Sequence, residues 1–434
     1  MVQLTKSATE LELSPTLAAN ETVVRRRAQG LKVMHMGFGQ SPFPVPERLK
    51  TELAQRASNK DYLPTTGHGP LCDIIKQYHH DHLGIDTDKY DVIIGPGSKL
   101  LIYALQMAIK GSLLMPVPSW VSYAPQAIMI HTNVIKVPTT LDDKGLHIDA
   151  EELRDVIINA REEGMNPSKI ILNYPNNPTG LTIPDDELEA IAKVCQEEDI
   201  LIISDEIYGL LSFDGKYRTI SKYAPEHTAI TTGLSKYMSL GGWRLGIGFV
   251  PKAIPGLHSL LCNIASETWS CVASPVQEAA MSVYEGHDDI EKFIKDSCDI
   301  HALVNTYIAQ GLRDAGIACT LPQGAFYNFP NFDAYKGEIN ALGVRTSREF
   351  SQYMLEHYGI ASIYGKACGT PRGQMSLRLS GCDYKGEDVL AAYQNGEALN
   401  EDFIARNTPN VKDAVETFAQ FMDDLKGGRA KKAA

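Results

Sequence analysis

The chain has 434 residues, of which 44% are hydrophobic and 22% charged, and 41 Lys and Arg against 53 Asp and Glu give a net charge of −12. This balance argues against general binding of nucleic acid or anionic membranes. The length exceeds the roughly 250–300 residues that one hydrophobic core serves, so we expect a large domain and a smaller one.

The N-terminal stretch MVQLTKSATELELSPTL lacks the apolar core of a signal peptide, and no apolar run approaches the roughly 18–20 residues that a membrane span needs. The eight cysteines form no C-x-x-C pair. The run YHHDH, which begins at Tyr78, does not place three ligands on one helix face. We therefore expect a cytosolic protein with free thiols and no metal site.

The predicted elements begin with a polar arm of about 30 residues. From Asp91 onward, apolar runs of strand length alternate with helical patterns, including an amphipathic helix from Asp185 to Asp199. This alternation predicts a largely parallel sheet that is covered on both faces. After about Ile300, helices mix with short strands, which suits a smaller α+β lobe. We expect the arm and part of the small domain in residues 1–50, the large domain in 51–305 and the small domain in 306–434.

Polar clusters follow several predicted strands, at the sheet edge where open α/β sheets bind ligands. NYPNNPTG follows one strand, Asp205 ends ILIISD, and Lys236 ends AITTGLSK. IIGPGSKLLIYAL is a Gly-rich turn that opens a helix, where backbone N–H groups favour an anion. Each cluster alone also has a structural interpretation, as a turn, a helix cap or a surface charge.

The order of these motifs resembles that of the class I/II aminotransferases, which are fold-type I pyridoxal-phosphate enzymes. The resemblance implies an α/β fold with a mostly parallel sheet of the seven-stranded type and a smaller α+β domain. The matching motifs cover roughly residues 14 to 385 and are DYLPTTGHGPL, GPGSKLLIYAL, PSWVSY, NYPNNPTG, SDEIY, SK with an arginine eight positions later in GGWRLG, GAFY and SLRLS.

The resemblance also implies a catalytic apparatus built around pyridoxal 5′-phosphate. Lys236 would hold the cofactor as a Schiff base and then move the proton between the substrate Cα and the cofactor's C4′ carbon. Asp205 would keep the pyridine nitrogen protonated, while Asn177 and Tyr208 would hydrogen-bond the ring oxygen. Trp120 would stack on the ring. The phosphate would be bound by Gly97, Ser98, Lys99, Ser235 and Arg244.

Substrate and assembly follow from the same resemblance. Arg378 would grip the substrate α-carboxylate beside the backbone of Gly39, and Lys99 and Thr16 match residues that bind a distal carboxylate in bacterial-type aspartate and prephenate aminotransferases. Tyr62 would reach the phosphate of a neighbouring subunit, which implies a homodimer with shared active sites. Two departures stand out. Gly233 replaces a phosphate-binding Ser or Thr, and GQSPFPVP lacks the acidic GEPDF of close relatives.

We therefore predict transfer of an amino group between an L-amino acid, best aspartate or another dicarboxylic one, and a 2-oxo acid such as 2-oxoglutarate. If Lys99 only adds charge beside the phosphate and Thr16 is an exposed arm residue, the alternative is an aminotransferase of aromatic or other neutral amino acids. A lyase on the same fold, catalysing β-elimination or cyclopropane formation, is a further alternative. A cofactor-binding regulator is disfavoured, because the arm before Leu31 leaves no room for a DNA-binding domain.

Overall fold

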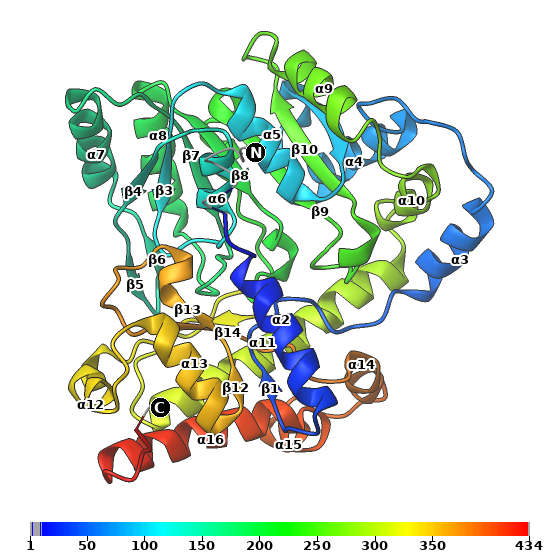
Figure 1. Ribbon diagram of the computed structural model, residues 1–434. Coiled ribbons are helices and arrows are strands. Elements are labelled where there is room, and N and C mark those ends of the chain that lie inside the picture. The colour runs from blue at the N-terminus through cyan, green and yellow to red at the C-terminus, as the bar shows by residue number, and fades with distance from the viewer. Residues whose placement is uncertain (1, 3–8, 10, 433–434) are drawn as a thin grey trace.

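One large β-sheet lies in the upper half of the computed structural model, which describes residues 2, 9 and 11–432 (Figure 1). Part of the predicted arm, residues 1, 3–8 and 10, lies outside the described residues. The strand order is β2-β10-β9-β8-β7-β3-β4, and neighbours are parallel except at β10, which is antiparallel to β2 and β9. The predicted mostly parallel, seven-stranded sheet is confirmed. Its strands are β2 (Tyr90–Gly95), β3 (Ser112–Pro116), β4 (Val134–Val137), β7 (Pro167–Asn173), β8 (Leu201–Asp205), β9 (Thr228–Gly233) and β10 (Gly246–Pro251).

Helices cover both faces of this sheet, which explains why its strands are almost continuously apolar. Successive residues of a strand point to opposite faces. In β8, Ile202 belongs to the core beneath α7 and α8, whereas Ile203 belongs to the core beneath α5, α6 and α9. In β2, Ile94 likewise packs with α4, and Ile93 packs with α5. These helices are α4 (Gly69–Leu83), α5 (Ser98–Ala108), α6 (Tyr123–Met129), α7 (Ala150–Glu162), α8 (Asp185–Glu197) and α9 (Leu257–Thr268).

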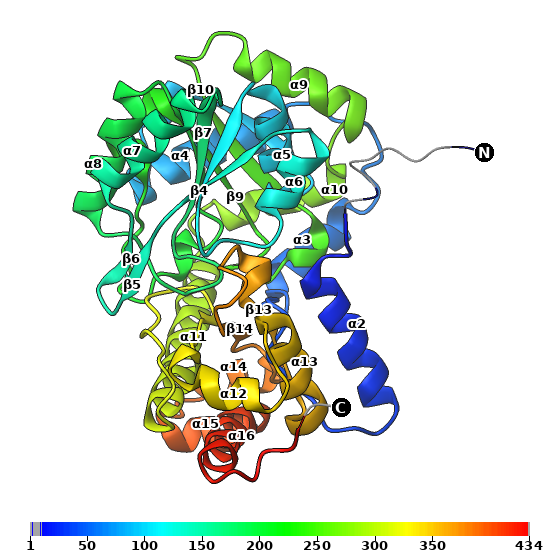
Figure 2. The ribbon, with the colours of Figure 1, turned by 60° about the vertical axis from the view of Figure 1, so that its left-hand side comes forward.

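The lower half contains a small antiparallel sheet of order β11-β14-β13, surrounded by the C-terminal helices (Figures 1 and 2). The long helix α11 joins this half to the large sheet. Residues 305 and 306 both lie inside this helix, and the predicted domain boundary between them stays a prediction. The elements are α11 (Asp288–Asp314), β11 (Tyr327–Asn328), α12 (Lys336–Ala341), α13 (Ser347–Tyr358), β12 (Ile360–Ala361), β13 (Ile363–Tyr364), β14 (Leu377–Ser380), α14 (Gly386–Gln394), α15 (Glu401–Asn407) and α16 (Pro409–Lys426).

The N-terminal segment returns to the C-terminal half of the chain. Helix α2 (Pro15–Ala28) runs beside α13 in both views, and β1 (Met34–His35) pairs in parallel with β12 (Figures 1 and 2). The arm therefore reaches the space between the two sheets. The remaining elements are α3 (Glu47–Arg56), the hairpin of β5 (Thr140–Asp142) and β6 (Gly145–His147), and α10 (Ser274–Ala279).

The described part of the chain has no feature of a membrane span or of a metal centre. There, no helix combines the length and the apolarity that crossing a bilayer requires. Nor do three His, Cys, Asp or Glu side chains come together in it as a metal site would need. In the YHHDH run, His79 is buried and its Nδ1 lies 2.7 Å from the carbonyl oxygen of Ile75. The predicted cytosolic location stays a prediction.

Candidate active site

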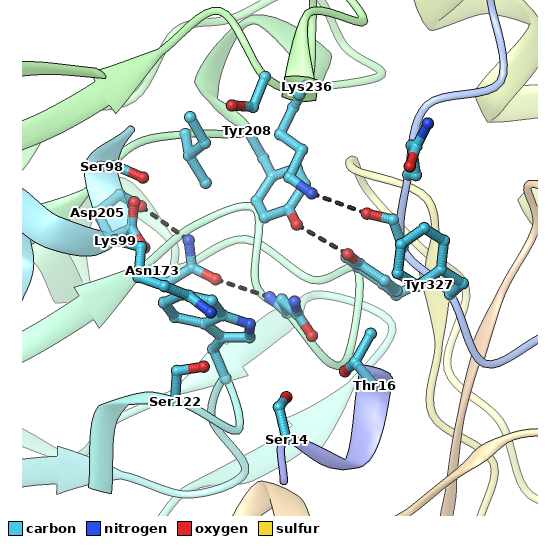
Figure 3. A pocket seen from close by; sticks show the side chains of 18 of the residues that line it. Ser14, Thr16, Ser98, Lys99, Ser122, Asn173, Asp205, Tyr208, Lys236 and Tyr327 are labelled. Carbon is cyan, nitrogen blue, oxygen red and sulfur yellow. Dashed lines mark hydrogen bonds between the residues drawn. The ribbon is translucent and has the colours of Figure 1, made fainter. Parts of the chain in front are cut away.

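A cavity of about 400 Å³ lies where the carboxyl ends of the parallel strands meet α2 and β14 (Figure 3). The order of strands β9, β8 and β7 brings the ends of three separate motifs to this point. The structure thereby brings together most of the residues that the sequence suggested. Those that line the cavity are Thr16, Gly39, Ser98, Lys99, Trp120, Asn177, Asp205, Tyr208, Ser235, Lys236, Arg244 and Arg378.

Lys236 follows β9 and carries an amine that is held at the centre of the cavity. Its Nζ donates a hydrogen bond of 2.8 Å to the carbonyl oxygen of Gly39. It also lies 5.6 Å from the ring centre of Tyr208 and 5.5 Å from that of Phe326. Burial lowers the pKa of this amine to about 8, since a charged ammonium loses hydration there. A substantial fraction of the amine is therefore neutral, and nucleophilic, near physiological pH.

Asp205 is the last residue of β8, and its carboxyl group is buried without a cation in contact. It is 3% exposed, and its Oδ2 accepts a hydrogen bond of 2.6 Å from the hydroxyl of Tyr123. Burial raises its pKa to about 6, although the bond from Tyr123 acts in the opposite direction. Among the described residues, no salt bridge involves Asp205. A cation placed against Asp205 would favour its ionised form.

The start of α5 forms an anion-binding corner. Gly97 caps the helix with φ +87°, and a Cβ added to it would lie 2.1 Å from Nη2 of Arg244. Within the described residues no side chain caps the helix, so the N–H groups of Ser98 and Lys99 can meet a ligand, whereas that of Leu100 donates to the Gly97 carbonyl oxygen (3.3 Å). Arg244 is fixed by bonds from Nη1 to the Gly241 carbonyl oxygen (2.8 Å) and from Nη2 to the Pro96 carbonyl oxygen (3.1 Å). The hydroxyl groups of Ser98 and Ser235 line the same cavity.

The structure explains why position 233 of this chain is a glycine. It ends β9 opposite Gly246 of β10, and a Cβ added to Gly233 would lie 2.6 Å from the carbonyl oxygen of Leu245. Gly233 is not among the residues that line the cavity. The close approach of two strands therefore explains why a serine or threonine is missing here.

Arg378 on β14 presents a buried guanidinium to the cavity. It is 1% exposed, and it donates from Nη2 to the Gly37 carbonyl oxygen (2.7 Å) and from Nη1 to Oδ1 of Asn177 (3.3 Å). Its buried Nε has no hydrogen-bond partner among residues 2, 9 and 11–432. In the described part of the chain, no carboxylate pairs with it. A guanidinium with a free N–H is suited to a ligand carboxylate.

Lys99 and Thr16 add two further polar side chains to the lining of the cavity. The Nζ of Lys99 lies 5.0 Å from the centre of the Trp120 ring, and burial together with the charge of Arg244 lowers its pKa. Thr16, in the first turn of α2, has a buried hydroxyl that finds no hydrogen-bond partner in the described part of the chain. The arm thus adds a polar group to a cavity that is built mainly from the large sheet.

Two predicted residues do not line this cavity. Gly97 packs against Arg244 and is not part of the lining, and Tyr62 is 91% exposed. Sequence reasoning in turn assigned no role to three residues that do line it, namely Tyr123, Asn173 and Tyr327. Each stands inside a quoted motif, PSWVSY, NYPNNPTG or GAFY, so the motifs themselves were the available signal.

Comparison with known proteins places this geometry in a family. The family model described as aminotransferase class I and II matches residues 32–393. The chain belongs to this family. The sequence-based prediction of an aminotransferase, in a family of pyridoxal-phosphate-dependent enzymes, is thereby confirmed.

Several relatives of this aminotransferase are similar over most of their length. An asparagine–oxo-acid transaminase of Streptococcus mutans is 31% identical over 88% of this chain and 95% of its own. An aspartate aminotransferase of Bacillus subtilis is 30% identical over 87% of this chain and 94% of its own. The solved structure of aspartate aminotransferase from Thermus thermophilus with maleate has a TM-score of 0.80 and 23% identity, covering 97% of this chain and 100% of that one. This last likeness shows the fold.

Proposed function

We propose that this aminotransferase uses pyridoxal 5′-phosphate to move an amino group between a dicarboxylic L-amino acid, best aspartate, and a 2-oxo acid such as 2-oxoglutarate. The charge of the cavity carries the proposal. Its lining holds four cationic side chains, Lys99, Lys236, Arg244 and Arg378, but one carboxylate, Asp205. None of these five forms a salt bridge within the described residues. A phosphate and two carboxylates would supply the missing anions, in a chain whose net charge is −12.

The residues present fit the cofactor. The corner at the start of α5, with Ser98, Ser235 and Arg244, suits its phosphate, and the buried Asp205 suits a protonated ring nitrogen. The bound cofactor would act as an electron sink for the substrate's α carbon. Tyr123 orients Asp205 through the 2.6 Å bond, and Trp120 offers an aromatic face to a ring.

The protein's own groups would divide the remaining work. Lys236 would first hold the cofactor through Nζ and, once released by the incoming amine, would take the proton from the substrate's α carbon. Its lowered pKa favours this role, because a base must be neutral to accept a proton. Arg378 would fix the α-carboxylate, and Asn177, bonded to the same guanidinium, would link that site to the ring oxygen.

The preference for a dicarboxylic substrate rests on Lys99 and Thr16. Both line the cavity, and neither has a carboxylate partner among the described residues. A second substrate carboxylate would pair with the ammonium of Lys99 and accept the hydroxyl hydrogen of Thr16. Relatives named for aspartate and asparagine favour the same size of substrate.

A panel of amino acids with 2-oxoglutarate tests this assignment. We expect glutamate to form, with aspartate a better donor than alanine, leucine or phenylalanine. Lys99→Ala should slow acidic donors selectively, by roughly ten- to hundred-fold for one lost charge-assisted hydrogen bond. Equal loss for acidic and neutral donors would assign Lys99 to the cofactor and leave a neutral amino acid as substrate. Pyruvate and ammonia in place of glutamate would identify a lyase.

The active site is also proposed to be shared across a homodimer. Tyr62 is 91% exposed and does not line the cavity of its own chain, so its ring is free to reach a second subunit. Mixing Tyr62→Phe and Lys236→Ala subunits tests this arrangement. If the site is shared, one site of the mixed dimer carries neither lesion, and activity above that of either variant returns. A fully active monomer in sedimentation would contradict the proposal.

A further inference from the structure

Tyr327, the first residue of β11, connects two groups of the active site and has no role in the function proposed so far. Its side chain is 1% exposed, and its hydroxyl lies 2.8 Å from the hydroxyl of Tyr208 (Figure 3). The guanidinium of Arg378 lies over its ring, 4.9 Å from the ring centre. Tyr327 therefore contacts both the residue proposed to face the cofactor's ring oxygen and the residue proposed to hold the substrate.

The hydrogens of the two hydroxyl groups limit what this pair can do. Each tyrosine hydroxyl has one hydrogen, so within the pair one group donates and the other accepts. Burial raises the pKa of Tyr327 to about 12 and that of Tyr208 well above its usual range, so both groups keep their hydrogens at neutral pH. No other hydrogen-bond partner of either hydroxyl is present within the described residues. By itself the pair can therefore adopt either direction.

An acceptor placed next to Tyr208 removes this choice. If Tyr208 gives its single hydrogen to the ring oxygen of a bound cofactor, its hydroxyl can only accept from Tyr327. We propose that Tyr327 is a positioning residue, whose hydroxyl donates to Tyr208 and so directs the hydrogen of Tyr208 toward the cofactor. This inference rests on the proposed function of the site.

The surroundings of Tyr327 hold its hydroxyl in place. A Cβ added to Gly39 would lie 2.0 Å from this oxygen, so the Gly39 backbone closes one side of it. The strand β11 pairs with β14, where Tyr327 stands opposite Ser380. The ring planes of Tyr208 and Tyr327 meet at 84° with centres 5.7 Å apart. The oxygen position is thus fixed, and rotation about the C–O bond is the freedom that remains.

The expected effect is a change in the titration of the cofactor bound to Lys236. A hydrogen bond from Tyr208 makes the ring oxygen a weaker acceptor for a proton on the nitrogen that joins Lys236 to the cofactor. It therefore lowers the pKa of that nitrogen. Tyr327→Phe keeps the ring beneath Arg378 but removes the hydrogen bond that Tyr208 accepts, so Tyr208 becomes a weaker donor to the ring oxygen. The pKa should rise, with the roughly 0.4 to 1 unit that the loss of one whole hydrogen bond would cause as its upper limit.

The experiment is a pH titration of the visible absorbance of the loaded, full-length enzyme. It compares wild type, Tyr327→Phe, Tyr208→Phe and the double variant. We expect the Tyr208→Phe change to raise the pKa at least as much as Tyr327→Phe, and the double variant to match Tyr208→Phe alone, because no hydroxyl then remains to be directed. Tyr284→Phe is the matched control. The Tyr284 hydroxyl pairs with that of Tyr237 at 2.8 Å outside the cavity. In this variant the pKa of the nitrogen that joins Lys236 to the cofactor should therefore equal that of wild type.

Three results would overturn the inference. The first is an unchanged pKa in Tyr327→Phe, and the second is an equal shift in the wild-type and Tyr208→Phe backgrounds, which would indicate a general structural effect. The third is loss of cofactor binding by folded Tyr327→Phe, which would make the hydroxyl a binding group. A wild-type protein that shows no absorbance band with pyridoxal phosphate would instead contradict the proposed function, so the two failures are distinguishable.

Discussion

Replacing Arg378 by lysine separates the shape of the carboxylate site from its charge. The guanidinium donates from Nη2 to the Gly37 carbonyl oxygen and from Nη1 to Oδ1 of Asn177, while Nε has no partner within the described chain. Lysine has one nitrogen, so it cannot keep both protein contacts and also offer two parallel N–H groups to a carboxylate. Losing one charge-assisted hydrogen bond of about 1.5 to 3 kcal/mol should weaken binding roughly ten- to hundred-fold.

The assay is the dissociation constant of succinate, a dicarboxylate without a reactive amine, measured by calorimetry on the loaded enzyme. Cofactor affinity should change little in Arg378→Lys, because Arg378 is placed at the substrate end. Arg372→Lys is the control, since Arg372 is exposed and does not line the cavity, and it should bind succinate like wild type. Unchanged succinate affinity in Arg378→Lys, or an equal loss of cofactor affinity, would refute the assignment of the carboxylate to this residue.

Four further predictions concern Asp205, Lys236 and Gly233. Asp205→Asn should reduce turnover roughly ten- to hundred-fold or more, because an amide cannot hold the proton on a ring nitrogen. Since burial raises the folded-state pKa of Asp205 to about 6, above the usual value, its ionisation destabilises the cofactor-free fold as pH rises. The cofactor-free variant should therefore melt above wild type at pH 7 and approach it near pH 4, and a lower melting temperature at pH 7 would contradict this. The pKa of Lys236 is lowered to about 8, so the rate at which the cofactor-free protein reacts with pyridoxal phosphate should rise about tenfold per pH unit up to about pH 8 and then level off. A rise that continues past pH 10 would indicate a lysine with an ordinary pKa. Gly233→Ser should reduce the free energy of unfolding by about 1 to 3 kcal/mol and so lower the melting temperature, because the new Cβ would meet the Leu245 carbonyl oxygen. An unchanged melting curve together with tighter cofactor binding would show that the position merely lacks a hydrogen-bond donor.

The sequence predicts the large sheet well because each central strand is apolar on both faces. Ile202 and Ile203 pack on opposite faces of β8, so both must be apolar, and a polar residue such as Asp205 at the strand end then stands out. The antiparallel direction of β10 was not predicted, since an apolar strand has the same composition in either direction.

The roles of Tyr123 and Tyr327 depend on which helices and strands meet in the fold, and no local sequence pattern predicts this. Tyr123 opens α6 and reaches Asp205, which lies 82 positions later in the chain. Tyr327 meets Tyr208 across 119 positions. Tyr62 is a different case, because its proposed partner is a second subunit. Motifs therefore predict which side chains carry chemistry, whereas the contacts that orient them emerge from the fold.

Mapping the lysine that holds the cofactor tests the central claim most directly. The enzyme would be loaded with pyridoxal phosphate, reduced with borohydride to fix the linkage, digested and analysed by mass spectrometry. Lys169 is the internal comparison, because burial lowers its pKa to about 8 as well, but its Nζ is bonded to the carbonyl oxygens of Ile109 and Gly111. We predict the cofactor mass on the peptide that contains Lys236 and none on that of Lys169. Attachment to another lysine, or no attachment in folded protein, would contradict the account.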